Sequence, residues 1–256
     1  MLTDPRVSAC IVLYHSGAEA VNTVKCIRDA TLPIDLFIVD NSPEESTAAV
    51  ISKMMPEAHV LRQERNIGFG RGNNAVLPHL RSVYHLIVNP DITFEPELIE
   101  RMVAFMDEHK EIAVLTPRVF NPDGTEQFLP KRRPTVRYLL GGKLTRFGDV
   151  FRRWRAEFTL QDQTVTRPME VDFATGCFML IRTHYFYQLR GFDPQFFLYH
   201  EDSDLSLRAK RLGPIVYHPD MHVTHKWSRE SSHNARGMLL HLASTAKFFR
   251  KWGWKW

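Results

Sequence analysis

The sequence predicts an α/β fold in which helices flank a mostly parallel central sheet. Two observations lead to this prediction. In the first half of the chain, short apolar runs rich in β-branched residues alternate with stretches of helical pattern. Polar and acidic side chains follow directly after several of these runs. Alternation of this kind is typical of parallel strands whose sheet is covered by helices on both faces.

Strands and helices are expected to alternate along the first half of the chain. The strands are the apolar runs at residues 8–14, 36–39, 59–61, 86–88 and 112–115. The helices lie between them, at residues 18–30, 43–55, 72–80 and 96–109. The second helix has the strongest start signal. Ser42 can cap it, Pro43 suits its first position, and Glu44 lies near the positive end of its dipole.

The pattern changes in the second half. Residues 118–167 form a basic stretch punctuated by proline and glycine, which we interpret as an insertion with a short helix near residues 138–140. Apolar character then returns at residues 171–181, interrupted by Thr175 and Gly176. The remaining expected elements are a helix at residues 203–212, short strands at 215–217 and 221–224, and a final amphipathic helix at 235–252.

Bulk composition is that of an ordinary soluble domain. The chain has 256 residues, of which 44% are hydrophobic and 24% charged. No apolar run reaches the length of a membrane span, and the start of the sequence lacks the apolar core of a signal peptide. The three cysteines form no zinc or disulfide pattern, so we expect a cytoplasmic protein. Its basic runs, at residues 131–133 and 137–155 and near the C-terminus, favour anionic partners or a solvated face.

Polar side chains follow several of the expected strands. Tyr14 follows the first strand, Asp40 the second, and Asn89 and Asp91 the fourth. In open sheets of this class, ligands bind beyond the carboxyl ends of the strands. A carboxylate at such a position can hold a divalent cation, and Asp202, which follows an aromatic cluster, could remove a proton from an attacking hydroxyl. The pairing suggests group transfer from a diphosphate-activated donor.

A glycine-rich run follows the third strand. Its spacing is G-x-G-x-G, beginning at Gly68, which differs from the dinucleotide-binding fingerprint in both spacing and position. A dehydrogenase is therefore disfavoured. One interpretation is a tight loop whose backbone amides and side chains, including Asn66 and Asn73, approach a bound nucleotide. A plain turn at the entry to a helix carries equal weight.

A specific resemblance rests on five segments in a fixed order. They are Phe37-Ile-Val-Asp-Asn-Ser42, Asn66-Ile-Gly-Phe-Gly-Arg-Gly-Asn-Asn74, Leu86-Ile-Val-Asn-Pro-Asp91, Thr175-Gly-Cys-Phe-Met179 and Gly191-Phe-Asp-Pro-Gln-Phe-Phe-Leu-Tyr-His-Glu-Asp-Ser-Asp-Leu205. Together they resemble family 2 glycosyltransferases, and within them the bacterial rhamnosyltransferase-like branch. The resemblance implies a GT-A fold over residues 1–232. Its nucleotide-binding half is 1–117, its acceptor-binding half is 118–232 with the basic insertion, and a C-terminal amphipathic, basic and aromatic helix occupies 233–256.

The resemblance also implies roles for individual residues. Asp40 would bind the nucleoside, and Asp91 is the last acid of a D-x-D-type metal motif in which Asn89 replaces the first. The metal is expected to be Mg²⁺ or Mn²⁺, with His225 as a further ligand. Asp202 would be the catalytic base, although capping of the helix at 203–212 is an alternative role. The remaining candidates for the nucleotide sugar are Tyr14, Asn66, Gly68 and Asn73. Gly176 is a candidate for the acceptor, and Glu201 and Asp204 would bind the acceptor or fix the start of the helix. Arg229 and Ser232 are candidates for phosphate or plain surface.

The implied reaction is inverting transfer of a sugar from a nucleoside-diphosphate donor, dTDP- or UDP-linked. We expect rhamnose from dTDP-rhamnose, delivered to a hydroxyl of a growing bacterial surface polysaccharide on a polyprenyl lipid. A nucleotidyltransferase acting on sugar phosphates is the alternative enzyme. A basic nucleic-acid-binding module is a more distant one, and we expect no nucleic-acid partner. The C-terminal helix either lies on the anionic inner face of the cell membrane or packs on the core.

Overall fold

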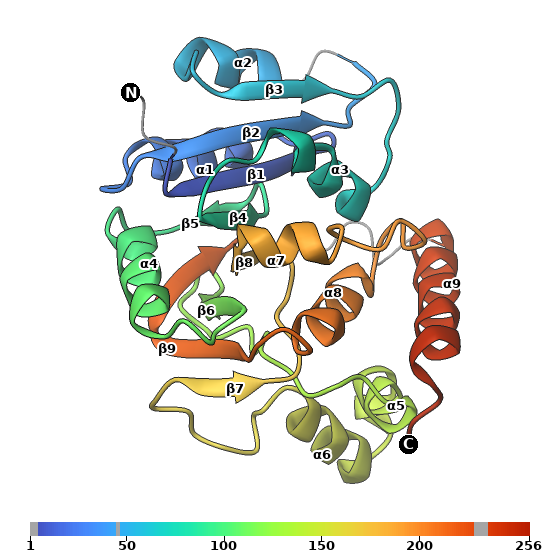
Figure 1. Cartoon of the computed structure of the whole chain (residues 1–256). Coiled ribbons are helices and arrows are strands. Elements are labelled where there is room, and N and C mark those ends of the chain that lie inside the picture. Colours follow the sequence, from blue (N-terminus) through green and yellow to red (C-terminus); the bar gives the residue numbers. More distant parts are fainter. Residues whose placement is uncertain (1–4, 45–46, 228–234) are drawn as a thin grey trace.

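The computed structural model describes residues 5–44, 47–227 and 235–256. A nine-stranded mixed sheet runs through these residues in the order β3-β2-β1-β4-β8-β6-β9-β5, with β7 paired to β9 (Figure 1). The strands are β1 (Val7–Leu13), β2 (Ile34–Asp40), β3 (His59–Arg62), β4 (Tyr84–Val88), β5 (Ile92–Thr93), β6 (Val114–Phe120), β7 (Met169–Val171), β8 (Phe178–Arg182) and β9 (Ile215–His225).

Strand direction changes halfway across the sheet. β1 pairs in parallel with β2 and β4, and β2 pairs in parallel with β3. β8 then lies antiparallel between β4 and β6, while β9 is parallel to β6 and antiparallel to β5 and β7. The α/β class is thus confirmed, with the parallel part in the first half of the chain.

Helices cover both faces of the sheet. They are α1 (Ala18–Arg28), α2 (Thr47–Met54), α3 (Phe69–Ala75), α4 (Leu98–Glu108), α5 (Val136–Leu144), α6 (Asp149–Phe158), α7 (Thr183–Gln188), α8 (Glu201–Ala209) and α9 (Ala235–Trp252), with short 3₁₀ helices η1 (Leu77–His79) and η2 (Thr145–Phe147). The apolar faces of α1, α2 and α4 share one core cluster with β1. α7 and α8 share a second cluster, on the other face. Every residue of β1 is therefore buried, as expected for a central parallel strand.

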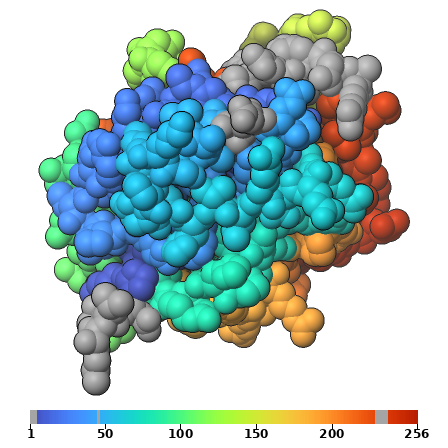
Figure 2. All heavy atoms as spheres, turned by 90° about the horizontal axis from the view of Figure 1, so that it is seen from above, coloured from blue at the N-terminus to red at the C-terminus, as the bar shows by residue number. Residues whose placement is uncertain are grey.

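Seen from above (Figure 2), the first third of the chain, blue to cyan, covers most of the visible face, and the red C-terminal helix lies at one side. One side of α9 packs on the protein: Phe248 and Phe249 are buried in a third cluster with Phe196. The core-packing prediction is confirmed for that side. No helix within the described ranges is both long and apolar enough to cross a membrane.

Several boundaries differ from those expected from sequence. Within the described residues α2 begins at Thr47 rather than Pro43. Ser42 does not act as its cap, because the hydroxyl of Ser42 accepts a hydrogen bond from the backbone N–H of His15. The helix expected at residues 72–80 is instead α3 followed by η1, in which Pro78 removes a backbone donor.

The second half contains two further differences. The two short strands expected at residues 215–217 and 221–224 form one strand, β9, whose pairing with β6 shifts register between Pro117 and Arg118. The basic insertion holds two helices, α5 and α6, where one short helix was expected near residues 138–140. The described part of the C-terminal helix ends where expected, at Trp252.

Candidate active site

Strands β1 and β2 bring Tyr14 and Asp40 to the same edge of the sheet. Their parallel register places Leu13 beside Asp40. Asp40 is buried, and its Oδ1 accepts a hydrogen bond of 3.0 Å from the backbone N–H of Ser42. Tyr14 is exposed, and its ring meets the ring of His15 edge-on at 4.4 Å. The end of the parallel sheet thus presents an aromatic surface beside a carboxylate.

The end of β4 brings Asp91 next to His225 at the end of β9. His225 Nε2 lies 3.2 Å from Asp91 Oδ1 and 3.4 Å from Asn89 Nδ2. The two residues meet because β5, which follows Asp91, pairs antiparallel with β9 and places Ile92 opposite His225. Side-chain exposure is 16% for Asp91 and 5% for His225, so the pair lies just below the surface.

Gln127, which the motifs did not indicate, fixes the orientation of His225. Its Nε2 donates to the backbone oxygen of His225 at 2.7 Å and to Asn121 Oδ1 at 2.8 Å. The amide orientation is therefore set, and Gln127 Oε1 must accept from His225 Nδ1, 3.0 Å away. The proton of a neutral His225 then sits on Nδ1, which leaves a lone pair on Nε2.

This arrangement fits a divalent cation. A lone pair on Nε2 and a carboxylate oxygen at 3.2 Å repel each other unless a proton or a cation lies between them. An imidazole held by a partner on its other nitrogen is also the usual form of a metal-bound histidine. In the part of the chain that the structure describes, no three histidine, cysteine, aspartate or glutamate side chains are placed to hold one metal ion together. Further ligands would have to come from a bound phosphate or from water.

Asp202 lies in the first turn of α8, which begins at Glu201 with His200 in the preceding position. The interpretation of Asp202 as the helix cap is therefore wrong, because the helix begins before it. Asp202 Oδ1 accepts from the backbone N–H of Ser203 at 2.8 Å, and Oδ2 accepts from the backbone N–H of Gly176 at 3.2 Å. Both oxygens are thereby held in place by backbone donors.

Gly176 and Cys177 connect Asp202 with the end of β4. The backbone N–H of Asn89 donates to the oxygen of Cys177 at 2.8 Å, while the backbone N–H of Gly176 donates to Asp202. Burial raises the pKa of the Cys177 thiol to about 12, and the charges of Asp202 and Asp91 also raise it. The Gly176–Cys177 dipeptide thus contacts both Asp202 and Asn89, which lies two residues before Asp91.

Lys131 is a partly buried cation whose charge acts on Asp202. Its Nζ lies 5.0 Å from the ring centre of Phe173 and 5.8 Å from that of Phe158. Burial lowers the pKa of Lys131, and the charge of Asp202 opposes that shift. Burial likewise raises the pKa of Asp202, and Lys131 is the leading influence that lowers it. Sequence placed Lys131 only in a basic run, because its closeness to Asp202 comes from folding.

Glu201 is almost fully enclosed. Burial raises its pKa, and the neighbouring charge of Asp202 raises it further. Its Oε2 is buried without a hydrogen-bond partner among the described residues. An unsatisfied buried carboxyl oxygen is costly and calls for an explanation such as an absent ligand. Glu201 therefore stays a candidate for acceptor binding.

Asp204 has a structural role instead. It has no exposed surface, and its oxygens contact Arg208 Nε at 2.7 Å, Lys251 Nζ at 2.6 Å and Trp252 Nε1 at 2.8 Å. Because these three donors satisfy Asp204 inside the fold, an acceptor could reach it only by opening the contact between α8 and α9. The expectation that Asp204 binds the acceptor is replaced by a role in holding α9.

The glycine-rich loop opens α3, as expected, and it is fastened to the segment before α8. Asn74 Nδ2 donates to the oxygen of Phe192 at 2.7 Å, and the N–H of Phe192 donates to Asn74 Oδ1 at 2.8 Å. Gly68 has a φ of +87°, and a Cβ there would lie 2.3 Å from the backbone oxygen of Phe197. Glycine is thus required both by conformation and by close approach.

The two asparagines predicted in this loop differ in position. Asn66 Oδ1 accepts from the N–H of Gly68 at 2.9 Å and supports the turn. Asn73 is fully buried, and its Nδ2 donates to the oxygen of Phe69. Asn73 therefore presents no exposed surface here, and its role toward the nucleotide stays a prediction. Arg229 and Ser232 lie outside the described residues.

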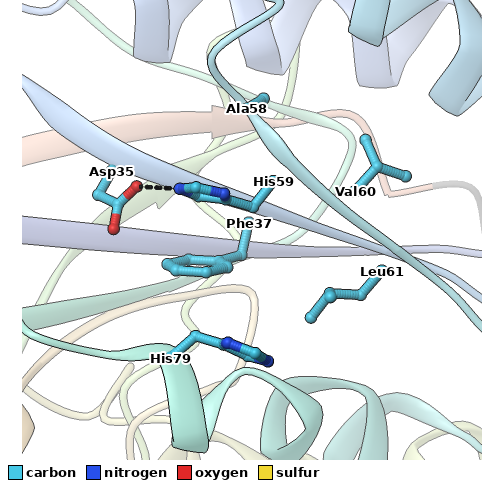
Figure 3. A pocket seen from close by; sticks show the side chains of 7 residues that line it. All are labelled: Asp35, Phe37, Ala58, His59, Val60, Leu61 and His79. Carbon is cyan, nitrogen blue, oxygen red and sulfur yellow. Dashed lines mark ion pairs between the residues drawn. The ribbon is translucent and has the colours of Figure 1, made fainter.

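A cavity of about 510 Å³ lies away from these residues, beside the amino end of β2. Figure 3 shows its lining, with the ring of Phe37 between His59 and His79 and an ion pair of 3.0 Å between His59 and Asp35. Asp35 and Asp40 lie near opposite ends of the same strand. None of the candidate residues lines this cavity, so the site at the carboxyl ends of the strands is the better candidate.

The chain is similar to known glycosyltransferases in both sequence and fold. A model of glycosyl transferase family 2 matches residues 8–190. The N-acetylglucosaminyl-diphospho-decaprenol L-rhamnosyltransferase of Mycobacterium tuberculosis is 25% identical over 261 residues, which cover 95% of this chain and 84% of that protein. The rhamnosyltransferase WbbL of Escherichia coli is 25% identical over 200 residues, which cover 72% of this chain and 70% of that protein.

Solved structures share the fold. GalNAc-T7 with UDP, GalNAc and Mn²⁺ has a TM-score of 0.65 at 16% identity, covering 88% of this chain and 44% of that one. S. aureus TarS 1–349 in complex with UDP has a TM-score of 0.61 at 18% identity, covering 92% of this chain and 64% of that one. This chain therefore spans less than two thirds of either protein. Both structures have the glycosyltransferase GT-A architecture predicted from the motifs.

Proposed function

This chain belongs to glycosyl transferase family 2, and we propose that it is a metal-dependent, inverting transferase acting on a lipid-linked acceptor. The observation that supports this most strongly is the Gly176–Cys177 dipeptide, which contacts Asn89 on one side and Asp202 on the other. A strand-end acid suited to a cation and a partly buried acid suited to proton transfer then serve one site. Membership of the family also favours sugar transfer over nucleotidyl transfer.

The donor would bind at the carboxyl ends of β1, β2 and β4, in what we call the donor half, residues 7–93. Exposed Tyr14 offers a ring for the nucleoside, and Asp40 offers a carboxylate for its base or ribose. Asn66 and Gly68 shape the neighbouring loop, which Asn41 contacts through a 3.4 Å hydrogen bond to the oxygen of Gly68. The donor loop is thereby tied to the strand end.

Asp91 and His225 would hold Mg²⁺ or Mn²⁺, with Asn89 beside them. The cation would supply charge neutralisation for the departing diphosphate. Gln127 presents His225 in the tautomer that this role requires. The finding of Mn²⁺ in the GalNAc-T7 complex supports this choice of metal class.

Asp202 would act as the base. The acceptor oxygen forms a bond to the anomeric carbon as the bond from that carbon to the phosphate oxygen breaks, and the hydroxyl proton passes to a carboxylate oxygen of Asp202. Attack from the face opposite the leaving group inverts the configuration. Backbone N–H groups of Gly176 and Ser203 keep the carboxylate oriented, and Glu201 lies beside it to meet the acceptor.

Rhamnose from dTDP-rhamnose is the donor that we propose, because two of the relatives are rhamnosyltransferases. The name of the mycobacterial relative describes a diphospho-decaprenol acceptor, which supports a polyprenyl-linked saccharide here. A lipid-linked acceptor would also place the enzyme at the inner face of the cell membrane. The exposed Met238, Leu239 and Leu242 on the outer side of α9 support such a contact.

A thermal-shift panel tests this function. dTDP-rhamnose, UDP-sugars and GDP-sugars are each added with and without Mn²⁺, because a ligand that binds only the folded state raises its stability. We expect dTDP-rhamnose with Mn²⁺ to give the largest increase in melting temperature, and Asp91→Asn to lose the part that depends on Mn²⁺. The same increase in the absence of metal would contradict the cation site. No increase with any nucleotide sugar would contradict the function.

A further inference from the structure

An apolar groove lies between α5 and α9, and we call it the α5–α9 groove. Its volume is about 170 Å³, and most of its lining surface is apolar. The lining residues are Val136, Leu139, Leu140, Lys143, His241, Thr245, Phe249 and Trp254. Both walls belong to segments that the proposed reaction does not use.

The base of the groove is buried and its edge is exposed to solvent. Phe249 is buried in the cluster that joins α9 to the protein, and Val136 and Leu139 pack against that cluster. Trp254 is stacked on Phe249 with ring centres 4.9 Å apart, yet 69% of Trp254 is exposed. The backbone N–H of Val136 donates to the oxygen of Lys255 at 2.9 Å, which fastens the tail holding Trp254 to the start of α5. A large exposed ring beside an apolar floor indicates a surface that binds an apolar ligand.

One edge of the groove is cationic. Lys143 on α5 is exposed and forms no ion pair with any of the described residues. It lies near His241 on the opposite wall: burial lowers the pKa of His241, and the charge of Lys143 lowers it further. An unpaired ammonium at the end of an apolar groove complements a ligand that joins an anionic group to a hydrocarbon.

The groove lies next to the candidate active site, with the buried side chain of His200 between them. Thr245 Oγ1 lies 3.0 Å from His200 Nε2, and the rings of His200 and His241 are 5.6 Å apart. His200 directly precedes α8, whose first turn carries Asp202. The charge of Lys131, which also acts on Asp202, is among the influences that lower the pKa of His200. A single side chain therefore lies between the groove and the surroundings of the proposed base.

We infer that the α5–α9 groove binds the part of the acceptor's isoprenoid chain nearest its diphosphate, with Lys143 beside the phosphates. This inference rests on the proposed function, which requires a lipid-linked acceptor. A groove with a buried aromatic floor suits a single hydrocarbon chain, whereas a bilayer surface contacts exposed residues such as Leu239 and Leu242. The enzyme would thereby recognise the lipid of its acceptor as well as the sugar.

The test compares two soluble probes that share a diphosphate but differ in hydrocarbon length. Binding of farnesyl diphosphate and of isopentenyl diphosphate is measured by calorimetry on the full chain. We expect the farnesyl compound to bind at least about tenfold more tightly, because each hydrocarbon group removed from water adds to the affinity. Equal affinity for the two probes would overturn the inference.

Variants of the groove locate the binding. Trp254→Ala and Leu140→Gln should each reduce the preference for the farnesyl probe to less than about threefold, because they remove apolar lining. Val50→Gln is the matched control: Val50 is an exposed apolar residue on α2, and this change should leave the preference intact. Melting temperatures of all three variants show whether they fold as the wild type does. Retained preference in folded groove variants would overturn the inference.

Two further measurements separate this inference from the proposed function and from membrane contact. Stabilisation by dTDP-rhamnose with Mn²⁺ should be the same in the groove variants and the wild type. A loss of donor stabilisation would therefore contradict the proposed function, whereas a loss of the farnesyl preference alone concerns the groove. Vesicles of phosphatidylglycerol and phosphatidylcholine are then sedimented with each protein. Wild-type protein that pellets with vesicles through Trp254 and yet shows no preference for the farnesyl probe would assign the groove to the membrane, and would overturn the inference.

Discussion

The donor half, residues 7–93, and the acceptor-binding half, residues 118–232 with the C-terminal helix after it, are held together by different kinds of contact. In the donor half, the parallel register of β1 and β2 places Asp40 beside Leu13. β4 pairs with β1 on its other side, also in parallel, so the carboxyl end of β4 lies at the same edge of the sheet. In the acceptor-binding half and the C-terminal helix, side-chain pairs join distant elements, such as Asp204 with Lys251 and Asp172 with Lys210. The first kind of contact follows from a local sequence pattern, and the second does not.

The same contrast separates two aspartates of one helix. Among the described residues, Asp202 receives its hydrogen bonds from the backbone of Gly176 and Ser203, and the charge of Lys131 also acts on it. Asp204 is closed off by Arg208, Lys251 and Trp252. An acid without a directly bound cation can still accept a proton, whereas a fully paired one stabilises the fold. Neighbouring acids in one motif can therefore have separate roles.

The largest effect is expected for Asp202→Asn. An amide cannot take the proton of the acceptor hydroxyl, so kcat should fall by about 10²–10⁴-fold, the usual contribution of a positioned base. Binding of the nucleotide sugar should be unchanged, because no donor contact is removed. Single-turnover transfer and calorimetric donor binding check the two halves of this prediction. Turnover near the wild-type value would remove Asp202 from the role of base.

The pH dependence of the reaction sharpens the same assignment. The base must be ionised, so activity should fall as the pH drops through the pKa of Asp202, which burial raises. Lys131→Met removes a charge that lowers this pKa, and the acid limb of kcat/KM should therefore move to higher pH. A shift to lower pH, or no shift in a folded variant, would show that Lys131 does not act on the base.

A smaller effect, on stability rather than rate, is expected for Asp204→Ala. Removal of one member of a buried ionic group leaves its partners uncompensated, so the free energy of unfolding should fall by about 3 kcal/mol. Asp149→Ala is the control, because Asp149 pairs with Arg152 on the surface and such pairs contribute less than about 1 kcal/mol. Urea unfolding compares the two. Unchanged stability together with a large rise in the acceptor KM would restore an acceptor-binding role for Asp204.

The smallest effect is expected for Gln127→Leu, which tests the cation site through the residue that orients its proposed ligand His225. Loss of the partner on His225 Nδ1 should weaken Mn²⁺ binding in the presence of dTDP by about 10–100-fold, as is usual for outer partners of metal ligands. Electron paramagnetic resonance of free Mn²⁺ gives the affinity without reference to activity. Gln127→Glu keeps an acceptor for Nδ1 and should retain most of the binding. Equal loss in both variants would point to a general disturbance of the loop.

Sequence predicted the strands of the donor half well because their signals are local. Apolar runs, their spacing and the acids after them follow from strand and helix periodicity. The residues that it missed act through folding: Gln127 lies far from His225 in the chain, and Lys131 far from Asp202. Asp204 was assigned to the acceptor because a motif cannot show that Lys251 and Trp252 close over it. The start of α2 was misplaced because Ser42 bonds His15 instead of capping a helix.

The central claim is that Asp91 and Asp202 serve a single site. A crystal of the protein with Mn²⁺ and dTDP, measured at the manganese absorption edge, tests it most directly. The proposed mechanism predicts an anomalous peak within bonding distance of the carboxylate of Asp91 and of His225 Nε2, with the diphosphate attached to it and Asp202 facing the position of the transferred sugar. A diphosphate bound elsewhere, or a manganese ion away from Asp91, would contradict it.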